Sequence, residues 1–267
     1  MTDWKELLTE ACERARKVAR RESAGRRRGI EIGTGAAGDR TLFVDREAER
    51  EILDVLLGVP SLRILSEEKG FLGSRKASQV AVIDPIDGSS NFARGLPFYC
   101  TSIAIARGTT LRDVEHAIVM NLVSGELYYA GRGVGATKDG KPISTSTRTA
   151  LSDSVMGMDV SRAGEPTISK LVPLMTKIKR QVHLGANALE LCLLAEGKLE
   201  ATIDARQMIR VTDVAGGYLI SKEAGAIMTT PQGTELAPAF DLKARFSYVA
   251  SANASIHGQI IDTLRWI

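Results

Sequence analysis

One segment in the first half of the chain carries two carboxylates at a spacing that suits a metal ion. Residues 84–92 read Asp-Pro-Ile-Asp-Gly-Ser-Ser-Asn-Phe and continue the strand-like run 79–84. Asp84 and Asp87 stand on either side of a proline-locked bend, where their charges repel unless they are exposed or bridged by a cation. A hard divalent ion such as Mg²⁺ takes oxygen ligands and keeps positions open for phosphate, to which Gly88–Ser90 can present backbone N–H groups. The alternative interpretation is an ordinary turn, for which Asp, Pro and Gly are suited.

Two further acidic segments contain candidates for the same site. Glu67 and Glu68 directly follow the strand-like run 62–66. Asp213 opens the predicted helix 213–224. Since Asp is also a favoured helix N-cap, a purely structural role for Asp213 remains open at this point.

The elements that would position these side chains differ between the two halves of the chain. In the first half, apolar periodicity predicts helices over 3–24 and 45–57, separated by a Gly-rich stretch, and then strands over 62–66, 79–84, 101–106, 116–123 and 126–130 in an antiparallel or mixed sheet. Asp139-Gly140 predicts a hairpin turn. Beyond about residue 150, helices near 165–178, 186–196, 213–224 and from about 253 alternate with short strands, which is typical of an α/β arrangement.

We therefore expect two closely packed units. Residues 1–140 would form an N-terminal α+β half that carries the metal-binding DPIDGS loop, and residues 141–267 would form an α/β half that completes the active site.

The composition excludes several classes of protein. With 267 residues, 44% hydrophobic and 25% charged, the chain is neither disordered nor collagen-like. Three widely separated cysteines and an N-terminus without a signal-like apolar region predict a cytoplasmic protein with reduced thiols, and no uncharged run is long enough to cross a bilayer.

The basic run Arg14–Arg28 is typical of a solvated helix face, with attraction of an anionic substrate as the alternative. Because no aromatic residues are interleaved with it, we expect no nucleic-acid partner.

The acidic motifs occur together with others in a characteristic order. They read SEEKG (66–70), DPIDGSSNF (84–92) and TDVAGG (212–217), and they are accompanied by GVGATKDGKPI (133–143) and YVASANASIH (248–257). This set resembles the inositol monophosphatase family, in particular its archaeal-type inositol-1-monophosphatase/fructose-1,6-bisphosphatases, over nearly the whole chain. The resemblance implies a layered αβαβα sandwich of the sugar phosphatase type, with α+β and α/β character, and a homodimer.

The same resemblance implies Mg²⁺-dependent hydrolysis of a phosphate monoester with two or three ions. The implied metal ligands are Glu68, Asp84, the carbonyl of Ile86, Asp87 and Asp213. The implied substrate contacts are Asp87, Gly88, Ser89, Asn187 and Arg206. The Ser89 hydroxyl, paired with Asp45, would position and activate the attacking water together with Glu68, while the metal ions lower the pKa of that water.

Three positions depart from the family pattern. Thr212 stands where most members have Trp, which alters the packing behind Asp213, and Ser89 replaces the commoner Thr but keeps the hydroxyl. Ala37 falls where archaeal-type relatives typically have Asp, so one candidate ligand of a third metal is missing. The nearby Asp39 is an alternative ligand for that ion.

The substrate side of the sequence also departs from the animal-type pattern. Arg206 stands seven residues before Asp213, where animal-type enzymes carry a Glu that contacts inositol. A forked guanidinium suits a second phosphate, whereas the alternative is a surface Arg beside Asp204. Asn187 matches a second sugar-contacting position. Arg180 is a weaker candidate for an anion contact, and His183 is expected to be a sheet residue rather than a ligand.

The sequence thus predicts a phosphatase for a small sugar or inositol phosphate, active on inositol-1-phosphate and fructose 1,6-bisphosphate. One alternative is a phosphatase of the same superfamily for 3′-phosphoadenosine phosphates or NADP. Another is a non-catalytic anion-binding protein that uses Arg26–Arg28 and Arg206.

Overall fold

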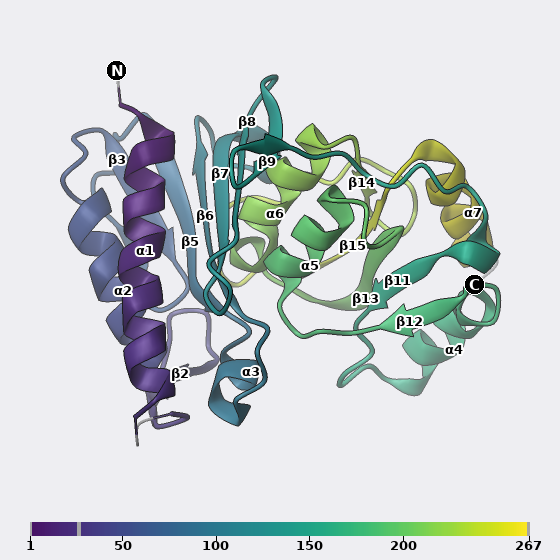
Figure 1. The fold of residues 1–267 in the computed structure, drawn as a ribbon, viewed down its shortest axis with the longest axis horizontal. Coiled ribbons are helices and arrows are strands. Elements are labelled where there is room, and N and C mark those ends of the chain that lie inside the picture. The colour runs from purple at the N-terminus through teal and green to yellow at the C-terminus, as the bar shows by residue number, and fades with distance from the viewer. Residues whose placement is uncertain (1, 26–27, 266–267) are drawn as a thin grey trace.

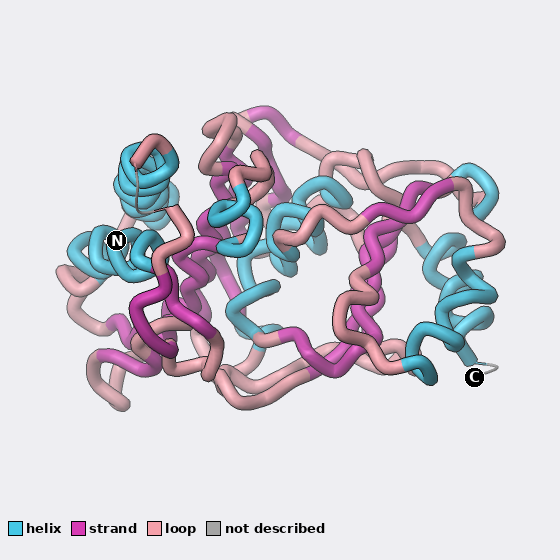
Figure 2. The backbone as a smooth tube through the Cα atoms, turned by 90° about the horizontal axis from the view of Figure 1, so that it is seen from below, coloured by secondary structure: helices cyan, strands magenta, loops and turns pink. Residues whose placement is uncertain are grey.

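The computed structural model describes residues 2–25 and 28–265 and arranges helices and sheets in five alternating layers. Figure 1 shows their order: α1 (Trp4–Ser23) and α2 (Phe43–Leu56), a large sheet, α5 (Asn187–Ala195) and α6 (Val211–Glu223), a smaller sheet, and finally α4 (Glu165–Met175) and α7 (Ala254–Arg265). In the view from below, the N-terminal and C-terminal helices lie at opposite ends of the molecule (Figure 2). This order confirms the predicted αβαβα sandwich.

The large sheet contains eight strands in the order β10-β9-β8-β7-β6-β5-β3-β4. Their bounds are β3 (Leu62–Ser66), β4 (Gly70–Leu72), β5 (Gln79–Asp87), β6 (Cys100–Ala106), β7 (Val114–Asn121), β8 (Leu127–Gly131), β9 (Gly135–Lys138) and β10 (Lys141–Pro142). β5 pairs in parallel with β3 and antiparallel with β6, so the sheet is mixed. The turn between β9 and β10 has positive φ angles of 50° at Asp139 and 77° at Gly140, which confirms the predicted hairpin.

The smaller sheet contains five strands in the order β12-β11-β13-β15-β14. Their bounds are β11 (Val155–Met158), β12 (Arg180–Val182), β13 (Ala201–Ile209), β14 (Ile227–Thr229) and β15 (Phe246–Ser251). The pairing of β13 with β15 is interrupted between Asp204 and Ile209, just before α6 begins. The chain passes from one sheet to the other after β10. The division into 1–140 and 141–267 itself remains a prediction.

Three apolar clusters hold the five layers together. One lies between α1, α2 and the large sheet and includes Leu8 and Ile103. The second surrounds α5 and α6 and contains residues of both sheets, such as Val82 and Tyr248. The third includes Ile260 and lies between the smaller sheet and α4 and α7. Because the second cluster joins both halves, it fixes the N-termini of α5 and α6 relative to the end of β5.

Two helices begin earlier than the sequence predicts. α6 begins at Val211, so Asp213 is its third residue and not its N-cap, and the N-cap interpretation is wrong. α2 likewise begins at Phe43, which makes Asp45 its third residue. In both cases the carboxylate accepts the backbone N–H of the N-cap residue, a bond that a sequence pattern places only to within a few residues.

The Gly-rich stretch forms a structure that the sequence analysis missed. β1 (Glu31–Thr34) and β2 (Arg40–Leu42) pair in a separate two-stranded sheet. The short strand β4 and the short helix α3 (Ser89–Arg94), which follows β5, were also not predicted as elements. These segments are too short to show apolar periodicity.

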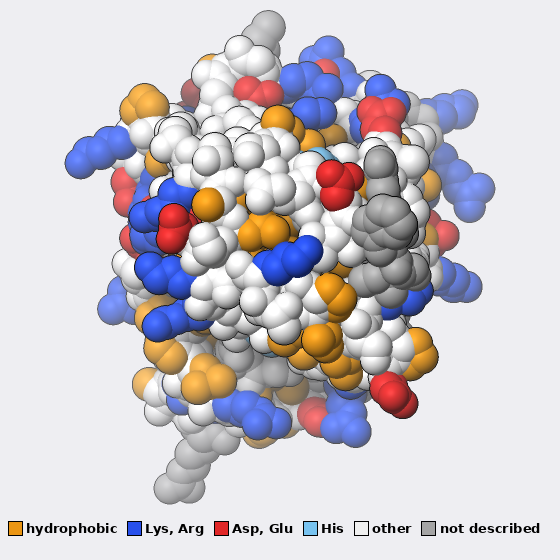
Figure 3. Space-filling model, turned by 90° about the vertical axis from the view of Figure 1, so that its right-hand side faces the viewer, with side chains coloured by type: hydrophobic (Ala, Val, Ile, Leu, Met, Phe, Trp, Pro, Cys, Tyr) orange, Lys and Arg blue, Asp and Glu red, His pale blue; other side chains and the backbone are white. Residues whose placement is uncertain are grey.

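The surface and the cysteines agree with an ordinary globular chain. Cys12, Cys100 and Cys192 are free and buried. On the end of the molecule formed by α4 and α7, Lys and Arg side chains lie mainly around the rim of the view, mixed with Asp and Glu (Figure 3). Within residues 2–25 and 28–265, no helix is both long and apolar enough to cross a membrane. Arg26 and Arg27 of the basic run lie outside the described residues.

Candidate active site

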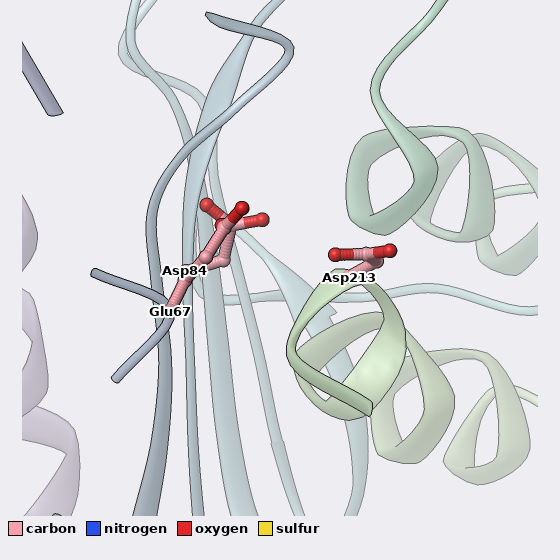
Figure 4. A group of neighbouring side chains, drawn as sticks. All are labelled: Glu67, Asp84 and Asp213. Atoms are coloured by element: carbon pink, nitrogen blue, oxygen red, sulfur yellow. The ribbon is translucent and has the colours of Figure 1, made fainter. Parts of the chain in front are cut away.

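Three carboxylates from three elements converge at one end of the large sheet. Glu67 follows β3, Asp84 lies in β5, and Asp213 lies in the first turn of α6. One carboxylate oxygen of each residue lies within 4.8 Å of the other two. Figure 4 shows Glu67 and Asp84 side by side, with Asp213 facing them from the start of the helix. The apolar cluster around α5 and α6 holds these elements together and thereby brings residues 67, 84 and 213 to one point.

Of the two adjacent glutamates, Glu67 rather than Glu68 belongs to this group. Successive side chains at the end of a strand point in opposite directions. Glu68 instead accepts a hydrogen bond from the Thr41 hydroxyl in β2. The geometry therefore makes Glu67 the better placed of the two glutamates to join Asp84 and Asp213, and the metal-ligand role of Glu68 stays a prediction.

The electrostatics of the group fit a hard divalent cation. Burial is the main cause that raises the pKa of Glu67 to about 7, and Arg210 opposes this rise. Burial also raises the pKa of Asp84 well above its ordinary value, with additional increases from Glu67 and Asp87. Asp84 Oδ1 is buried and has no hydrogen-bond partner among the described residues. Carboxylates that repel one another, with an oxygen left unpartnered, form the all-oxygen donor set that Mg²⁺ prefers.

Asp87 adjoins the three carboxylates at the N-terminus of α5. Its Oδ2 accepts a hydrogen bond of 2.7 Å from the backbone N–H of Ala188. Burial raises the pKa of Asp87 and Asp213 raises it further, whereas the backbone N–H groups of Ala188 and Asn187 oppose the rise. The orphan N–H groups of a helix start therefore orient this carboxylate.

Gly88 allows the loop after Asp87 to lie against the start of α5. Its φ is 93°, in the left-handed region that favours glycine. A Cβ at this position would lie 3.1 Å from the carbonyl oxygen of Phe98 and 3.2 Å from that of Gly185. Any side chain at position 88 would therefore push the loop and the α5 N-terminus apart.

The residues expected to hold the attacking water are neighbours in the structure. Asp45 is buried, its Oδ2 accepts the N–H of Leu42 at 2.8 Å, and its Oδ1 has no partner among the described residues. The Ser89 hydroxyl donates to the carbonyl oxygen of Ile86 at 2.9 Å. Burial raises the pKa of Asp45, and the Ser89 hydroxyl is close enough to oppose that rise.

Arg210 is a functional-site residue that the sequence analysis missed. Its guanidinium lies 2.6 Å from Glu67 and 3.1 Å from Asp213, and it also reaches Asp39 at 2.7 Å. Burial lowers the pKa of Arg210, but the neighbouring carboxylates, Asp213 and Glu67 first among them, together raise it above its ordinary value. The signal in the sequence is its position three residues before Asp213, which places both side chains on one face of the first helical turn.

Arg206 is not a surface residue. Its side chain is 6% exposed and ion-paired at 2.5 Å with both Asp204 and Asp159. It also donates to the backbone carbonyl of Ser161 at 2.9 Å. The alternative of a surface Arg beside Asp204 is therefore wrong about exposure, although the pairing with Asp204 is present. A second phosphate would have to share this guanidinium with two carboxylates.

The remaining predicted positions are more peripheral. Arg180 is exposed on β12. His183 lies just after β12, with Nδ1 3.5 Å from Glu190 and Nε2 3.5 Å from Asp159.

Thr212 is buried, and its hydroxyl donates to Asp213 Oδ1 at 3.3 Å. Thr212 thus supplies a hydrogen bond to a candidate metal ligand.

Comparison with known proteins identifies the family. A family model described as the inositol monophosphatase family matches residues 2–266. The chain belongs to the inositol monophosphatase family. Within this family, the fructose-1,6-bisphosphatase/inositol-1-monophosphatase of Methanothermobacter thermautotrophicus is 35% identical over 88% of this chain and 87% of that protein. A crystal structure described as an inositol monophosphatase-fructose 1,6 bisphosphatase has a TM-score of 0.87 at 27% identity and covers 98% of this chain and 100% of its own.

Another protein that is similar to this chain is named for a different substrate. The bifunctional NADP phosphatase/NAD kinase of Methanococcus maripaludis is 33% identical over 88% of this chain, which corresponds to 45% of that longer protein. Both relatives are named as phosphatases, that is, as phosphoric monoester hydrolases.

Proposed function

We propose that the chain is a Mg²⁺-dependent phosphomonoester hydrolase that acts on inositol-1-phosphate and fructose 1,6-bisphosphate. The observation that carries this proposal is the convergence of Glu67, Asp84 and Asp213, with an unpartnered oxygen on Asp84. The names of the archaeal relatives support the two substrates.

Five groups of this chain would hold the metal ions, two or three in number. They are the carboxylates of Glu67, Asp84, Asp87 and Asp213 and the carbonyl of Ile86. When bound, Mg²⁺ lowers the pKa of a water molecule and neutralises charge on the phosphate oxygens. The loop that begins at Gly88 and Ser89 would present backbone N–H groups to the same phosphate.

Ser89 and Asp45 would orient the attacking water. In the structure the Ser89 hydroxyl donates to Ile86, and Asp45 Oδ1 is buried without a partner. If the Ile86 carbonyl held a metal ion, the Ser89 hydroxyl would donate to Asp45 instead. The Ser89 oxygen would then accept a hydrogen bond from the water molecule. This bond would orient the water so that its oxygen lone pair points toward phosphorus.

The sugar side of the site would be formed by Asn187 and Arg206. Asn187 is the first residue of α5, directly beside the Asp87 carboxylate. Arg206 would contact a second phosphate at the price of sharing its guanidinium with Asp159 and Asp204. This arrangement favours a substrate that carries phosphate at both ends.

NADP is the second candidate substrate, because the similarity to the Methanococcus maripaludis protein favours it specifically. A 3′-phosphoadenosine phosphate would be hydrolysed by the same metal-dependent chemistry. Both differ from the sugar phosphates in the adenine ring rather than in the reacting phosphate.

Phosphate release from inositol-1-phosphate, fructose 1,6-bisphosphate, 3′-phosphoadenosine 5′-phosphate and NADP, with Mg²⁺ and with EDTA, tests the proposal. We expect Mg²⁺-dependent phosphate release from the first two compounds. The control is the Asp84→Asn variant, which should be inactive. Release from the adenine compounds alone would keep the mechanism and replace the substrate. No release from any of them would favour the non-catalytic anion-binding alternative.

A cytoplasmic homodimer remains part of the proposal. Sedimentation equilibrium of the purified chain tests the dimer, and a monomer at micromolar concentration would contradict it.

A further inference from the structure

Arg210 lies among the candidate metal ligands of the proposed function. One of its nitrogens, Nη1, is 2.6 Å from Glu67 Oε1 and 2.7 Å from Asp39 Oδ2, so a single donor bridges two carboxylates. The Nη2 atom reaches Asp213 Oδ1 at 3.1 Å. The Arg210 side chain is only 15% exposed, whereas that of Asp39 is 58% exposed.

The loop 35–39 brings Asp39 to this guanidinium. The backbone N–H of Ala36 donates to the carbonyl of Glu68 at 2.9 Å, and that of Ala37 donates to the carbonyl of Glu67 at 3.2 Å. The loop therefore lies directly over the two glutamates. Its only carboxylate, Asp39, pairs with Arg210.

We propose that the Arg210 guanidinium is a built-in cation of the candidate metal centre and holds the position between Asp39 and Glu67 against a weakly bound divalent ion. This inference rests on the metal centre of the proposed function. A guanidinium has five donors, no acceptor and a permanent charge, so it satisfies two carboxylates but cannot ligate a metal. It also repels any divalent ion that approaches the same two oxygens.

The carboxylates of the site thereby fall into two groups. Asp84 Oδ1 has no partner among the described residues and remains open to a tightly held ion. Glu67 Oε1 and Asp39 Oδ2 are already bridged by Arg210. Consequently Asp39 is an anchor for Arg210 in this chain, rather than a substitute for the carboxylate that is missing at Ala37.

The test is a count of bound Mn²⁺, measured from the signal of free Mn²⁺ in an electron paramagnetic resonance titration of the full-length chain. The proteins are the wild type, Arg210→Met, Asp39→Asn and the double variant. Arg40→Met is the matched control, because Arg40 lies next to Asp39 but is 79% exposed and paired with Glu31 outside the site.

We expect Arg210→Met to bind one additional Mn²⁺, or to bind the weakest ion at least about tenfold more tightly. The gain should disappear in the double variant, because the vacated position then lacks Asp39. Asp39→Asn and Arg40→Met should each bind as the wild type does. Arg210→Lys keeps the positive charge but loses the forked guanidinium, so it should show a smaller gain in Mn²⁺ binding. If Arg210→Met does not fold, the Arg210→Lys variant provides the test.

Three results would overturn the inference alone: no gain in either Arg210 variant, a gain that persists in the double variant, or a lost ion in Asp39→Asn. Absence of Mn²⁺ binding by the wild type would instead overturn the metal centre and the inference together.

Discussion

Backbone donors at helix starts orient three of the acidic side chains in the site. Asp45 and Asp213 are third residues of α2 and α6 and accept the N–H of the N-cap residue. Asp87 accepts the N–H of Ala188 at the beginning of α5. Each bond uses a donor that the helix cannot satisfy itself, so the carboxylates are held in place before any cation arrives.

Replacing Asp87 by Asn tests the metal centre without disturbing this scaffold. The amide oxygen of Asn keeps an acceptor for Ala188, but the charge that would hold an ion is lost. We expect turnover to fall by about two orders of magnitude or more, with an unfolding midpoint in EDTA that does not fall, because the substitution removes a buried carboxyl whose pKa is raised. Asp54→Asn, an exposed position on α2, is the control. Retained activity in Asp87→Asn would contradict its assignment as a ligand.

Arg206 offers a second test at the level of one side chain. If it contacts a distal phosphate, Arg206→Ala lowers kcat/KM for fructose 1,6-bisphosphate more than for inositol-1-phosphate. Because the substitution also leaves Asp159 and Asp204 unpaired, we expect a stability loss of about 3–5 kcal/mol. Arg206→Lys, which keeps the charge, separates the two effects. Equal losses for both substrates would mean that Arg206 only positions the carboxylates.

Single residues also show the limit of sequence-based prediction. The positions of Asp84, Asp87 and Asp213 follow from motifs with fixed local spacing. The choice between Glu67 and Glu68 does not, because it depends on which residue ends the strand and therefore on long-range pairing. Arg210 was missed because its role comes from Asp39 and Glu67, which are remote in sequence and meet it only in the folded chain.

At the level of elements, two consecutive glycines let α6 fit between the large sheet and α5. A Cβ on Gly216 would lie 2.4 Å from Ser102 Oγ in β6. A Cβ on Gly217 would lie 2.7 Å from Leu191 Cβ and 2.9 Å from the carbonyl oxygen of Ala188 in α5. The close packing of α5 and α6 fixes the distance between the start of α5, whose Ala188 N–H binds Asp87 at the end of β5, and the start of α6, which carries Asp213.

We therefore expect Gly217→Ala to separate α5 from α6. Since the contacts are a backbone oxygen and a Cβ, the neighbours cannot rotate away, and the free energy of unfolding should fall by about 1–3 kcal/mol. Mn²⁺ affinity should fall with it. The control is Gly258→Ala in α7, where a Cβ meets nothing within 4 Å and helix propensity predicts a gain of up to about 1 kcal/mol. Urea unfolding in EDTA measures both, and equal stability of the two variants would contradict the packing argument.

The elements were predictable where their signals are local. The Asp139-Gly140 turn and the apolar periodicity of α1 gave correct elements from the sequence. The β1–β2 pair was missed because its strands have three and four residues and only two side chains of β2 are buried. Nothing in such a segment marks its partner, and the loop between the two strands donates to the backbone carbonyls of Glu67 and Glu68, which are remote in sequence.

At the level of the whole molecule, the fold concentrates negative charge between the end of β5 and the starts of α5 and α6. The chain as a whole has a net charge of +3, yet the carboxylates of residues 67, 84, 87 and 213 lie together with Arg210 as their cation. Burial between the layers raises the pKa of the first three of these groups. The five-layered fold therefore stores an electrostatic cost in its centre that a bound divalent cation would relieve.

This cost predicts how the stability of the metal-free protein depends on pH. The folded chain keeps a proton on Glu67 up to a pKa of about 7, whereas the unfolded chain loses it near the ordinary value of 4.5. Because the folded state binds more protons in this interval, its stability falls as pH rises from about 4.5 to 7. His116 and His257, whose pKa values are lowered by burial, change stability in the opposite direction. The comparison must therefore be made against a variant in which only the carboxyl is removed.

That variant is Glu67→Gln, measured by urea unfolding in EDTA at pH 5.5 and pH 8. The wild type should lose more stability between these two pH values than Glu67→Gln does, by an amount on the order of 1 kcal/mol. Saturating Mg²⁺ should reverse the trend in the wild type, since the ligands must be deprotonated to bind it and the ion stabilises the folded state more at pH 8. Identical pH dependence of the two proteins in EDTA would show that Glu67 is already ionised at pH 5.5, held in that form by Arg210.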